Sequence, residues 1–376
     1  MSVPEPSAPI TVVLVDDSPV QRRFLRAALE AGQGLTVLGE ARNGKEAVAL
    51  VGRLRPAVVL MDLDLPVMSG IEAIEAIMSA SPTPIVVYSA FVGGTNSENA
   101  LEALAAGAVD VLAKPGPDDD GSLEDYAEVL RRTLRVAARI RVITHPRGRL
   151  RTQGMTGSVP ALGGGSRRPL AVSGLSQVRP GPPGGQVRLV AVGASTGGPQ
   201  ALLALLGRLP GDLGQAVLVV QHMAEGFIPG LAAWLDGLVP MPVVVGESGR
   251  RLVPGTVTLA PSGGNLLVQD DRLRVLCTPP APGQFHVPGI DVTFESVARS
   301  LGPEAVGVLL TGMGRDGAAG LLAMRRRGAF TLAQDEATCA VYGMPAAAVA
   351  QGAVERQLPL ERIAPALLAS LGRTSV

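Results

Sequence analysis

The sequence is poor in aromatic residues and in cysteine. Aromatic side chains make up 3% of its 376 residues, and Cys277 and Cys339 are its only cysteines. Because these two lack the paired spacing of a zinc or redox site, we expect two small buried apolar residues in a reducing compartment. Neither sign of charge is in excess, since 33 Lys and Arg residues balance 33 Asp and Glu residues. This balance disfavours nucleic acid as a partner and gives no overall attraction to an anionic membrane.

Long apolar runs are missing as well. No stretch reaches the roughly 18 uninterrupted apolar residues of a membrane helix, and "MSVPEPSAPI" lacks the basic and apolar segments of a signal peptide. We therefore expect a cytoplasmic protein with no direct membrane insertion. Hydrophobic residues still form 47% of the chain and charged ones 18%, which is a globular composition. The length predicts two domains with a connector, since domains usually span about 100 to 200 residues.

The N-terminal part alternates strand and helix patterns. Short β-branched runs that end in polar residues occur at 11–17, 57–62 and 84–90. The stretches between them are helix-like, and this alternation predicts a parallel sheet. A last helix, with a capping pair at Ser122 and Asp125, closes this part of the chain.

Composition divides the chain into four segments. Residues 145–186 contain six arginines, many Gly, Pro and Ser, and no acidic residue, a composition that cannot form a packed core. We interpret 144–186 as a flexible linker. Its basic side chains are expected to be exposed to water rather than to bind an acidic partner. The other segments are a disordered N-terminus over 1–9, a first domain over 10–143 and a second domain over 187–376.

A second parallel-sheet pattern follows the linker. Its strand candidates are 188–194, 216–222, 256–261 and 305–312. Strong helix patterns lie between and after them, and no internal repeat relates the two halves. The predicted fold class is therefore α/β, in two domains that are both built on parallel sheets.

Charged and hydroxyl side chains gather at the strand ends of the first domain. Asp16 and Asp17 end the run at 11–17, Asp62 ends the run at 57–62, Ser89 lies near the end of the run at 84–90, and Lys114 ends a further strand candidate in "LAKP". Parallel strands bring such positions to one edge of the sheet, where ligands bind. An aspartate after a strand is commonly only a turn or helix cap, but several carboxylates at one edge suit Mg²⁺. With the ion bound, Asp62 can accept a phosphoryl group that Lys114 and Ser89 then contact.

The motifs "LVDDS", "LMDLDLPVMSG", "VYSA" and "LAKP" together resemble the receiver domain of two-component response regulators, over about residues 10–135. The resemblance implies a doubly wound, flavodoxin-like fold, Mg²⁺ at the phosphorylation site and a sensor histidine kinase as partner. It assigns Asp62 as the phosphoacceptor, Asp16, Asp17 and Asp62 as metal ligands, Ser89 as the switch hydroxyl and Lys114 as the phosphate partner.

The stretch "VGASTGGPQ" (192–200) allows two interpretations of Ser195. Its glycines lie at a strand-to-helix turn, as in nucleotide-binding loops. The spacing, however, is not G-x-G-x-x-G, and the second strand ends in "QH" rather than in an acid. Gly193 to Gly197 fit G-x-S-x-G, which exposes a serine above the sheet. A serine needs a base, and His222 ends a strand candidate that, as a neighbour, lies about 4.8 Å away.

A third strand end offers an acid. Asp316 follows "AVGVLLTG" in a glycine-rich loop, so Ser195, His222 and Asp316 can share one edge as nucleophile, base and orienting acid. Taken singly, His222 can be a loop histidine and Asp316 a helix cap. Their order in the chain differs from the Ser, acid, His order of the α/β-hydrolases, which disfavours that fold.

The motifs "VGASTGGPQ", "QHM", "VLLTGMGRDGAAGLLAMRRRGA" and "AQDEATCAVYGMP" resemble the catalytic domain of chemotaxis protein-glutamate methylesterases. The resemblance implies a Rossmann-like domain that hydrolyses glutamate methyl esters on methyl-accepting chemoreceptors and deamidates receptor glutamines, with no cofactor for the esterase step. It implies Ser195, His222 and Asp316 as the triad, with Thr196 and Met313 as oxyanion or active-site neighbours.

Three positions depart from these families. Val111 stands where receivers usually carry an aromatic residue, which leaves ring rotation at the switch in doubt. Asn265 replaces a histidine, and Val287, shortly before Asp291, replaces a common basic residue. We expect these changes to affect receptor docking more than chemistry.

Two other functions remain open from the sequence. One is a phosphorylation-dependent adapter whose second domain only binds receptor tails. The other is a receiver-coupled esterase that acts on a non-chemotaxis signalling protein. A helix-turn-helix output is disfavoured, because the C-terminal half predicts a parallel sheet and lacks a basic recognition stripe.

Overall fold

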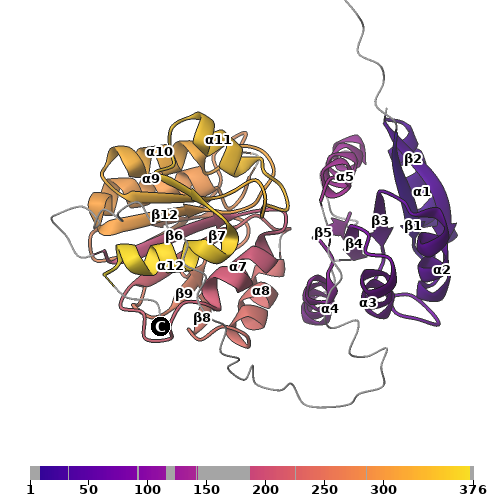
Figure 1. Cartoon of the computed structure of the whole chain (residues 1–376), viewed down its shortest axis with the longest axis horizontal. Helices are drawn as coiled ribbons and strands as arrows, with labels where there is room; N and C mark the ends of the chain where they lie inside the picture. The colour runs from indigo at the N-terminus through magenta and orange to yellow at the C-terminus, as the bar shows by residue number, and fades with distance from the viewer. Residues whose placement is uncertain are drawn as a thin grey trace, which may run out of the picture.

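The computed structural model describes residues 9–32, 34–90, 93–115, 123–140, 142, 187–224, 226–284 and 286–372. It contains two α/β units, each built around its own parallel sheet (Figure 1). The expected linker over 144–186, nearly all of the expected N-terminal segment and the predicted cap Ser122 lie outside the described residues.

The first unit is a five-stranded parallel sheet in the order β2-β1-β3-β4-β5. Its strands are β1 (Ile10–Val15), β2 (Leu35–Ala41), β3 (Val58–Met61), β4 (Ile85–Ala90) and β5 (Asp110–Lys114). Its helices are α1 (Pro19–Glu30), α2 (Gly44–Leu54), α3 (Gly70–Ala80), α4 (Gly93–Ala106) and α5 (Leu123–Ala137). The first three helices begin where the sequence supplies caps: Ser18, Asn43 and Ser69 each accept a hydrogen bond from a first-turn backbone N–H.

The second unit is a seven-stranded parallel sheet in the order β14-β13-β12-β6-β7-β9-β8. Its strands are β6 (Leu189–Ala194), β7 (Ala216–Gln221), β8 (Val243–Val245), β9 (Val257–Leu259), β12 (Ala305–Leu309), β13 (Phe330–Gln334) and β14 (Arg356–Leu358). An antiparallel pair lies outside this sheet, formed by β10 (Asn265–Val268) and β11 (Val275–Thr278).

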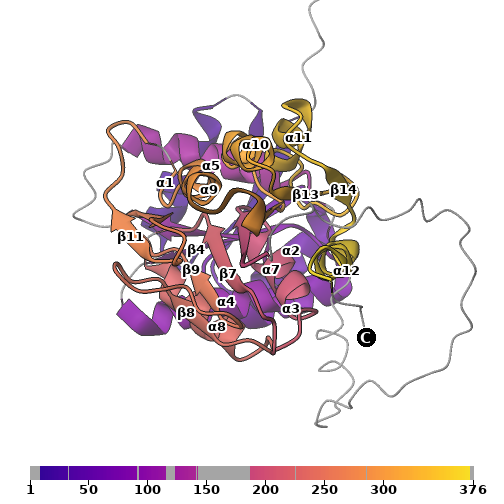
Figure 2. The ribbon, with the colours of Figure 1, turned by 90° about the vertical axis from the view of Figure 1, so that its left-hand side faces the viewer.

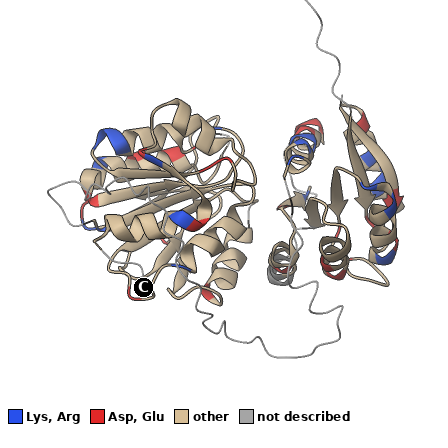
Figure 3. Cartoon of the chain, in the orientation of Figure 1, with Lys and Arg blue, Asp and Glu red and all other residues tan. Residues whose placement is uncertain are grey.

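Helices cover both faces of the second sheet (Figures 1 and 2). On one face lie α9 (Ile290–Leu301), α10 (Ala318–Arg326) and α11 (Met344–Ala350), and on the other α7 (Gly198–Leu206), α8 (Phe227–Asp236) and α12 (Leu360–Ser370). A 3-10 turn (Gly302–Glu304) leads from α9 into β12. Every residue of β6, β7 and β12 is buried, as a parallel sheet covered on both faces requires. Charged residues lie mainly on helices and loops (Figure 3).

Both parallel sheets confirm the predicted fold class, and each predicted strand run contains a strand. The expectation for cysteine was wrong. Cys277 and Cys339 are free but only half-buried, because one lies on the two-stranded hairpin and the other on a loop beyond β13. Burial raises the pKa of both thiols, that of Cys339 to about 12. In the described ranges, no helix is long and apolar enough to span a membrane.

The two units are in contact through the α4–β5 side of the first. Helix α4 packs against α8 and α7, and the Gln200 side-chain amide at the start of α7 donates to the Leu104 carbonyl of α4 at 2.5 Å. Thr196, beside the candidate nucleophile, makes a side-chain hydrogen bond to Asp110 of β5. The first unit therefore lies next to the loop that carries Ser195.

Candidate phosphorylation site and active site

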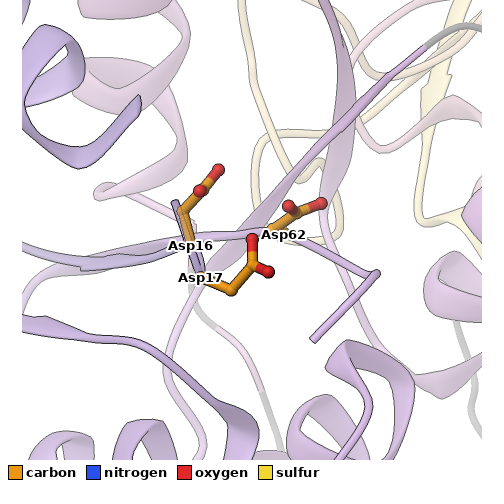
Figure 4. Close-up of side chains that lie close together, drawn as sticks. All are labelled: Asp16, Asp17 and Asp62. Carbon is orange, nitrogen blue, oxygen red and sulfur yellow. The ribbon is translucent and has the colours of Figure 1, made fainter. Parts of the chain in front are cut away.

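The three aspartates predicted as metal ligands come together. Asp16 and Asp17 follow β1, Asp62 follows the adjacent strand β3, and one carboxylate oxygen from each lies within 4.8 Å of the others (Figure 4). Asp16 and Asp62 are buried, whereas Asp17 is exposed. Carboxylate oxygens at this spacing fit a hard divalent cation.

Lys114 balances this negative charge. Its Nζ lies 2.6 Å from Asp62 Oδ2 and 2.9 Å from Asp16 Oδ2, and Asp62 Oδ1 also accepts from the Leu63 N–H. Burial raises the pKa of Asp62, and the nearby ammonium only partly offsets this. Burial works to lower the pKa of Lys114, but the two carboxylates outweigh it and the pKa rises. Lys114 therefore offsets part of the negative charge of these acids.

The remaining receiver residues lie on the neighbouring strands. Ser89 is buried near the end of β4 and pairs across the ladder with Ala113. Val111 is buried in β5. The sequence analysis overlooked Tyr88, a buried ring 5.1 Å below Lys114 Nζ. A cation over an aromatic face is attracted to it, so this ring helps to place the Lys114 ammonium.

In the second unit, strand register places the predicted triad at one edge. Ala194 of β6 pairs with Gln221 of β7, so Ser195 and His222 follow at adjacent strand ends. The His222 N–H donates to the Ala194 carbonyl at 3.0 Å. Strand β12 pairs with the other side of β6 and leads into the loop that carries Asp316. The neighbour relation of β6 and β7, on which the choice of His222 depended, is confirmed.

His222 and Asp316 form a direct hydrogen bond, 2.8 Å long, between Nε2 and Oδ2. Asp316 also accepts from the backbone N–H groups of Ile290, at 2.8 Å, and of Asp291, at 2.9 Å. Burial works to raise the pKa of Asp316, but the hydrogen bonds from His222 and these two N–H groups outweigh it, so the pKa lies well below its usual range. Asp316 is thus an ionised acid, as an imidazole partner requires.

Ser195 is fixed through its backbone. Its N–H donates to the Thr311 carbonyl at 3.0 Å, and its carbonyl accepts from the Gln221 side-chain amide at 2.9 Å. Over the ranges that the structure describes, no hydrogen bond joins the Ser195 hydroxyl to His222. His222 Nδ1 is buried and also has no partner in that part of the chain. This nitrogen is free to take a proton.

Thr196 and Met313 lie on the loops that frame this edge. The Thr196 carbonyl accepts from the Thr311 hydroxyl at 3.0 Å. Met313 is half-buried in the loop after β12. The structure thus places both in the segments that carry Ser195 and Asp316.

His286, which the sequence could not locate, stacks on the imidazole of His222. The two rings stack with centroids 4.6 Å apart and planes 7° apart. Burial, and next the neighbouring His222, lower the pKa of His286. Asn265 and Gln284 hold the loop in place through a pair of amide hydrogen bonds of 2.8 and 3.0 Å. The sequence signal was a third histidine, but no strand pattern placed it.

Comparison with known proteins finds a family model for each of the two α/β units. Residues 12–123 match the family model "Response regulator receiver domain" and residues 190–367 the model "CheB methylesterase". The chain is 41% identical to protein-glutamate methylesterase/protein-glutamine glutaminase 3 of Paramagnetospirillum magneticum, over 96% of each chain. It is 40% identical to the second such protein of Cupriavidus metallidurans, over 96% of this chain and 98% of that one. The crystal structure of the Thermotoga maritima CheB methylesterase catalytic domain is 32% identical, with a TM-score of 0.46, over 47% of this chain and 95% of that one.

The fold and the two sites define a class of enzyme in which a response-regulator receiver is joined to a parallel-sheet esterase domain. Near-complete coverage at about 40% identity identifies the particular family within it. The chain belongs to the CheB methylesterase family.

Proposed function

We propose that this enzyme hydrolyses γ-methyl esters of glutamate side chains on methyl-accepting chemoreceptors and deamidates receptor glutamines. The observation that carries the proposal is the 2.8 Å hydrogen bond between His222 and Asp316, at the strand end next to Ser195. The names of the relatives, which describe both activities, support this substrate class.

In the proposed mechanism, Ser195 is the nucleophile. Its hydroxyl attacks the ester carbonyl, and His222 takes the proton on Nδ1, the nitrogen that Asp316 leaves free. The imidazolium then gives that proton to the departing methanol. Water, activated by the same imidazole, hydrolyses the acyl-enzyme and releases the glutamate carboxylate. Asp316 holds the ring and stabilises its charged form.

The oxyanion of the tetrahedral intermediate needs donors. We assign this role to backbone N–H groups at the start of α7, next to Ser195, with Thr196 and Met313 as neighbours of the site. Each such donor contributes roughly 3 kcal/mol to transition-state stabilisation. The esterase step needs no cofactor in this mechanism.

In the receiver, we propose Asp62 as the phosphoacceptor and a sensor histidine kinase as the donor. Asp16, Asp17 and Asp62 would hold Mg²⁺, because their oxygens lie within 4.8 Å of one another. The ion, when bound, neutralises charge on the transferring phosphoryl group. Lys114 pairs with the resulting phosphate and Ser89 donates a hydroxyl to it. We place the protein in the cytoplasm, which suits its two free cysteines.

We further propose that the receiver restrains the esterase domain. We take the domains as 10–143 and 187–376, joined by the linker over 144–186. Contacts of α4 with α7 and α8, and of Asp110 with Thr196, support a restrained state in which the receiver lies against the active-site loop. Phosphorylation adds about −2 charge near Asp62 and shifts this contact.

Full-length protein incubated with radiomethylated receptor membranes tests the function. Released methanol should increase with a phosphodonor and should fall to background in Ser195→Ala. A Ser195→Ala protein that releases methanol at the parent rate would exclude the assigned nucleophile. Phosphodonor-dependent membrane binding without any methanol release would support an adapter instead.

A further inference from the structure

Two aspartates cap each other's helices beside the active site. Asp316, which precedes α10, accepts from the Ile290 and Asp291 N–H groups in the first turn of α9. In return, Asp291 Oδ1 accepts from the Gly320 N–H in the first turn of α10, at 2.6 Å. The residues before the two helices are glycines and provide no side-chain cap. The two carboxylates therefore satisfy N–H groups that would otherwise lack partners.

The helices meet at backbone distance where these caps lie. A Cβ on Gly320 would lie 2.6 Å from Phe294 Cβ and 2.8 Å from the Asp291 carbonyl oxygen. Such a close approach leaves little freedom for α10 to slide or rotate on α9. The position of Asp316 therefore depends on how the first turn of α10 is held against α9.

Asp291 also brings a second acid to the same place. Its backbone N–H donates to Asp316 Oδ1, and the nearby charges that raise the pKa of its carboxyl are those of Asp316 and Glu295. Burial first, and then the Asp316 charge, raise the pKa of Asp291 to about 6. Asp291 is thus ionised above pH 6 and neutral well below it, whereas Asp316 stays ionised.

We propose that Asp291 is a positioning residue for the esterase reaction: it fixes α10 against α9 so that Asp316 faces His222, and it adds a second negative charge behind the imidazole. This inference rests on the proposed role of Ser195, His222 and Asp316. Among the described residues, Asp291 makes hydrogen bonds to Asp316 and Gly320 and none to His222. It acts through Asp316, and a misplacement of about 1 Å at such a site lowers rates about 100-fold.

The experiment measures how fast a serine-reactive fluorophosphonate labels Ser195 in the full-length, phosphodonor-treated protein. Asp291→Ala removes both the cap and the charge, and we expect labelling about 100-fold slower. Asp291→Asn keeps an oxygen for the Gly320 N–H, and we expect it to restore most of the rate. Methanol release from receptor membranes should show the loss in kcat, with KM within twofold of the parent.

The pH dependence of the labelling rate distinguishes a positioning role of Asp291 from a purely structural one. We expect Asp291→Asn to be severalfold slower than the parent at pH 8 but equal to it at pH 5, because the parent carboxyl is then neutral too. The ratio of the two rates cancels the titration of groups that both proteins share. This ratio needs only Asp291→Asn. It therefore tests the positioning role of Asp291 even if Asp291→Ala folds poorly.

Two controls on α9 are matched to Asp291. Glu295→Ala removes an exposed acid one turn further along and should label at the parent rate. Val297→Ala destabilises the same helix by removing buried methyl groups, and it should also label normally below its melting temperature. A ratio that stays constant between pH 5 and pH 8, or an Asp291→Ala protein as fast as Glu295→Ala, would overturn the proposal. Labelling that survives in Ser195→Ala would instead contradict the proposed function.

Discussion

At the scale of single residues, Gly312 determines where Ser195 can lie. A Cβ on Gly312 would lie 2.7 Å from Ser195 Cβ and would also collide with Met344 Sδ. Both neighbours are packed: Met344 is fully buried, and the Ser195 backbone is hydrogen-bonded to the adjacent residue Thr311. No side chain fits at position 312 without moving Ser195.

We therefore expect Gly312→Ala to lower kcat for methyl-ester hydrolysis about 100-fold, the effect of a displacement near 1 Å. The loss should also be visible as slower fluorophosphonate labelling. Gly214→Ala is the matched control, because a Cβ there meets nothing within 4 Å. Equal rates for the two variants would show that Ser195 tolerates displacement.

Single residues also show where sequence reasoning reached its limit. The types and strand-end positions of Ser195, His222 and Asp316 were readable, because parallel strands send their C-terminal ends to one edge. The sequence could not tell which imidazole nitrogen meets Asp316, since that depends on ring orientation. Nor could it pair Asp291 with Gly320, a contact between residues 29 positions apart.

At the scale of elements, the loop from Gln284 to Gly289 is held by a buried amide. Asn265, on β10, accepts from the Gln284 side chain and the Gly289 N–H, both at 2.8 Å, and donates back to Gln284 at 3.0 Å. Asn265 is 3% exposed. Asn265, which replaces a histidine of the family and was expected to affect receptor docking, therefore has a structural role inside the domain. It supports the loop that stacks His286 on His222.

We predict that Asn265→Ala lowers the free energy of unfolding of the esterase domain by about 2–3 kcal/mol, because it leaves buried donors and acceptors unpaired. Urea unfolding followed by circular dichroism measures this change. Gln357→Ala, which removes an exposed hydrogen bond to Tyr342, should change stability by less than about 0.5 kcal/mol. Comparable losses in both variants would mean that the loop does not depend on Asn265.

Fully buried apolar strands were easier to predict than partly exposed ones. Strands β6, β7 and β12 are continuous buried runs of five or six residues, and a run of that kind marks a covered parallel strand. Strands β8 and β14 are three residues long and partly exposed, and β2 alternates buried and more exposed residues. None of the three lies in a predicted run, whereas β9, also three residues long but fully buried, does. The existence of β2, β8 and β14, and the order of most strands in the sheets, needed the structure.

At the scale of the whole molecule, one carboxyl lies between the two units. Asp110 begins β5 and makes hydrogen bonds with the Val111 N–H and the Thr196 side chain. Burial raises its pKa to about 6, against 3.8 for an ordinary aspartate, although both hydrogen bonds oppose the shift. A carboxyl with a raised pKa binds its proton more tightly in the closed arrangement. The stabilisation of closure is therefore present at low pH and is lost as the pH rises through 6.

At neutral pH the ionised Asp110 carboxylate therefore biases the closed state toward opening. Asp110→Asn is neutral at every pH and keeps an acceptor for Thr196. We predict that this variant closes more tightly at pH 7.5, so its basal esterase rate falls severalfold while its phosphodonor-stimulated rate stays near that of the parent. The measurement is the ratio of stimulated to basal methanol release, which cancels the pH dependence of the chemistry itself.

In the parent protein this ratio should rise as the pH drops from 7.5 to 5.5, because protonated Asp110 stabilises closure. In Asp110→Asn it should be high and flat over the same range. Glu102→Gln, which neutralises an exposed acid on the neighbouring helix α4, should follow the parent. Two results would contradict this role of Asp110: a parent ratio that does not change with pH, and a raised basal activity in Asp110→Asn. Either would mean that the ionised carboxylate stabilises the contact between the units through Thr196 instead of weakening it.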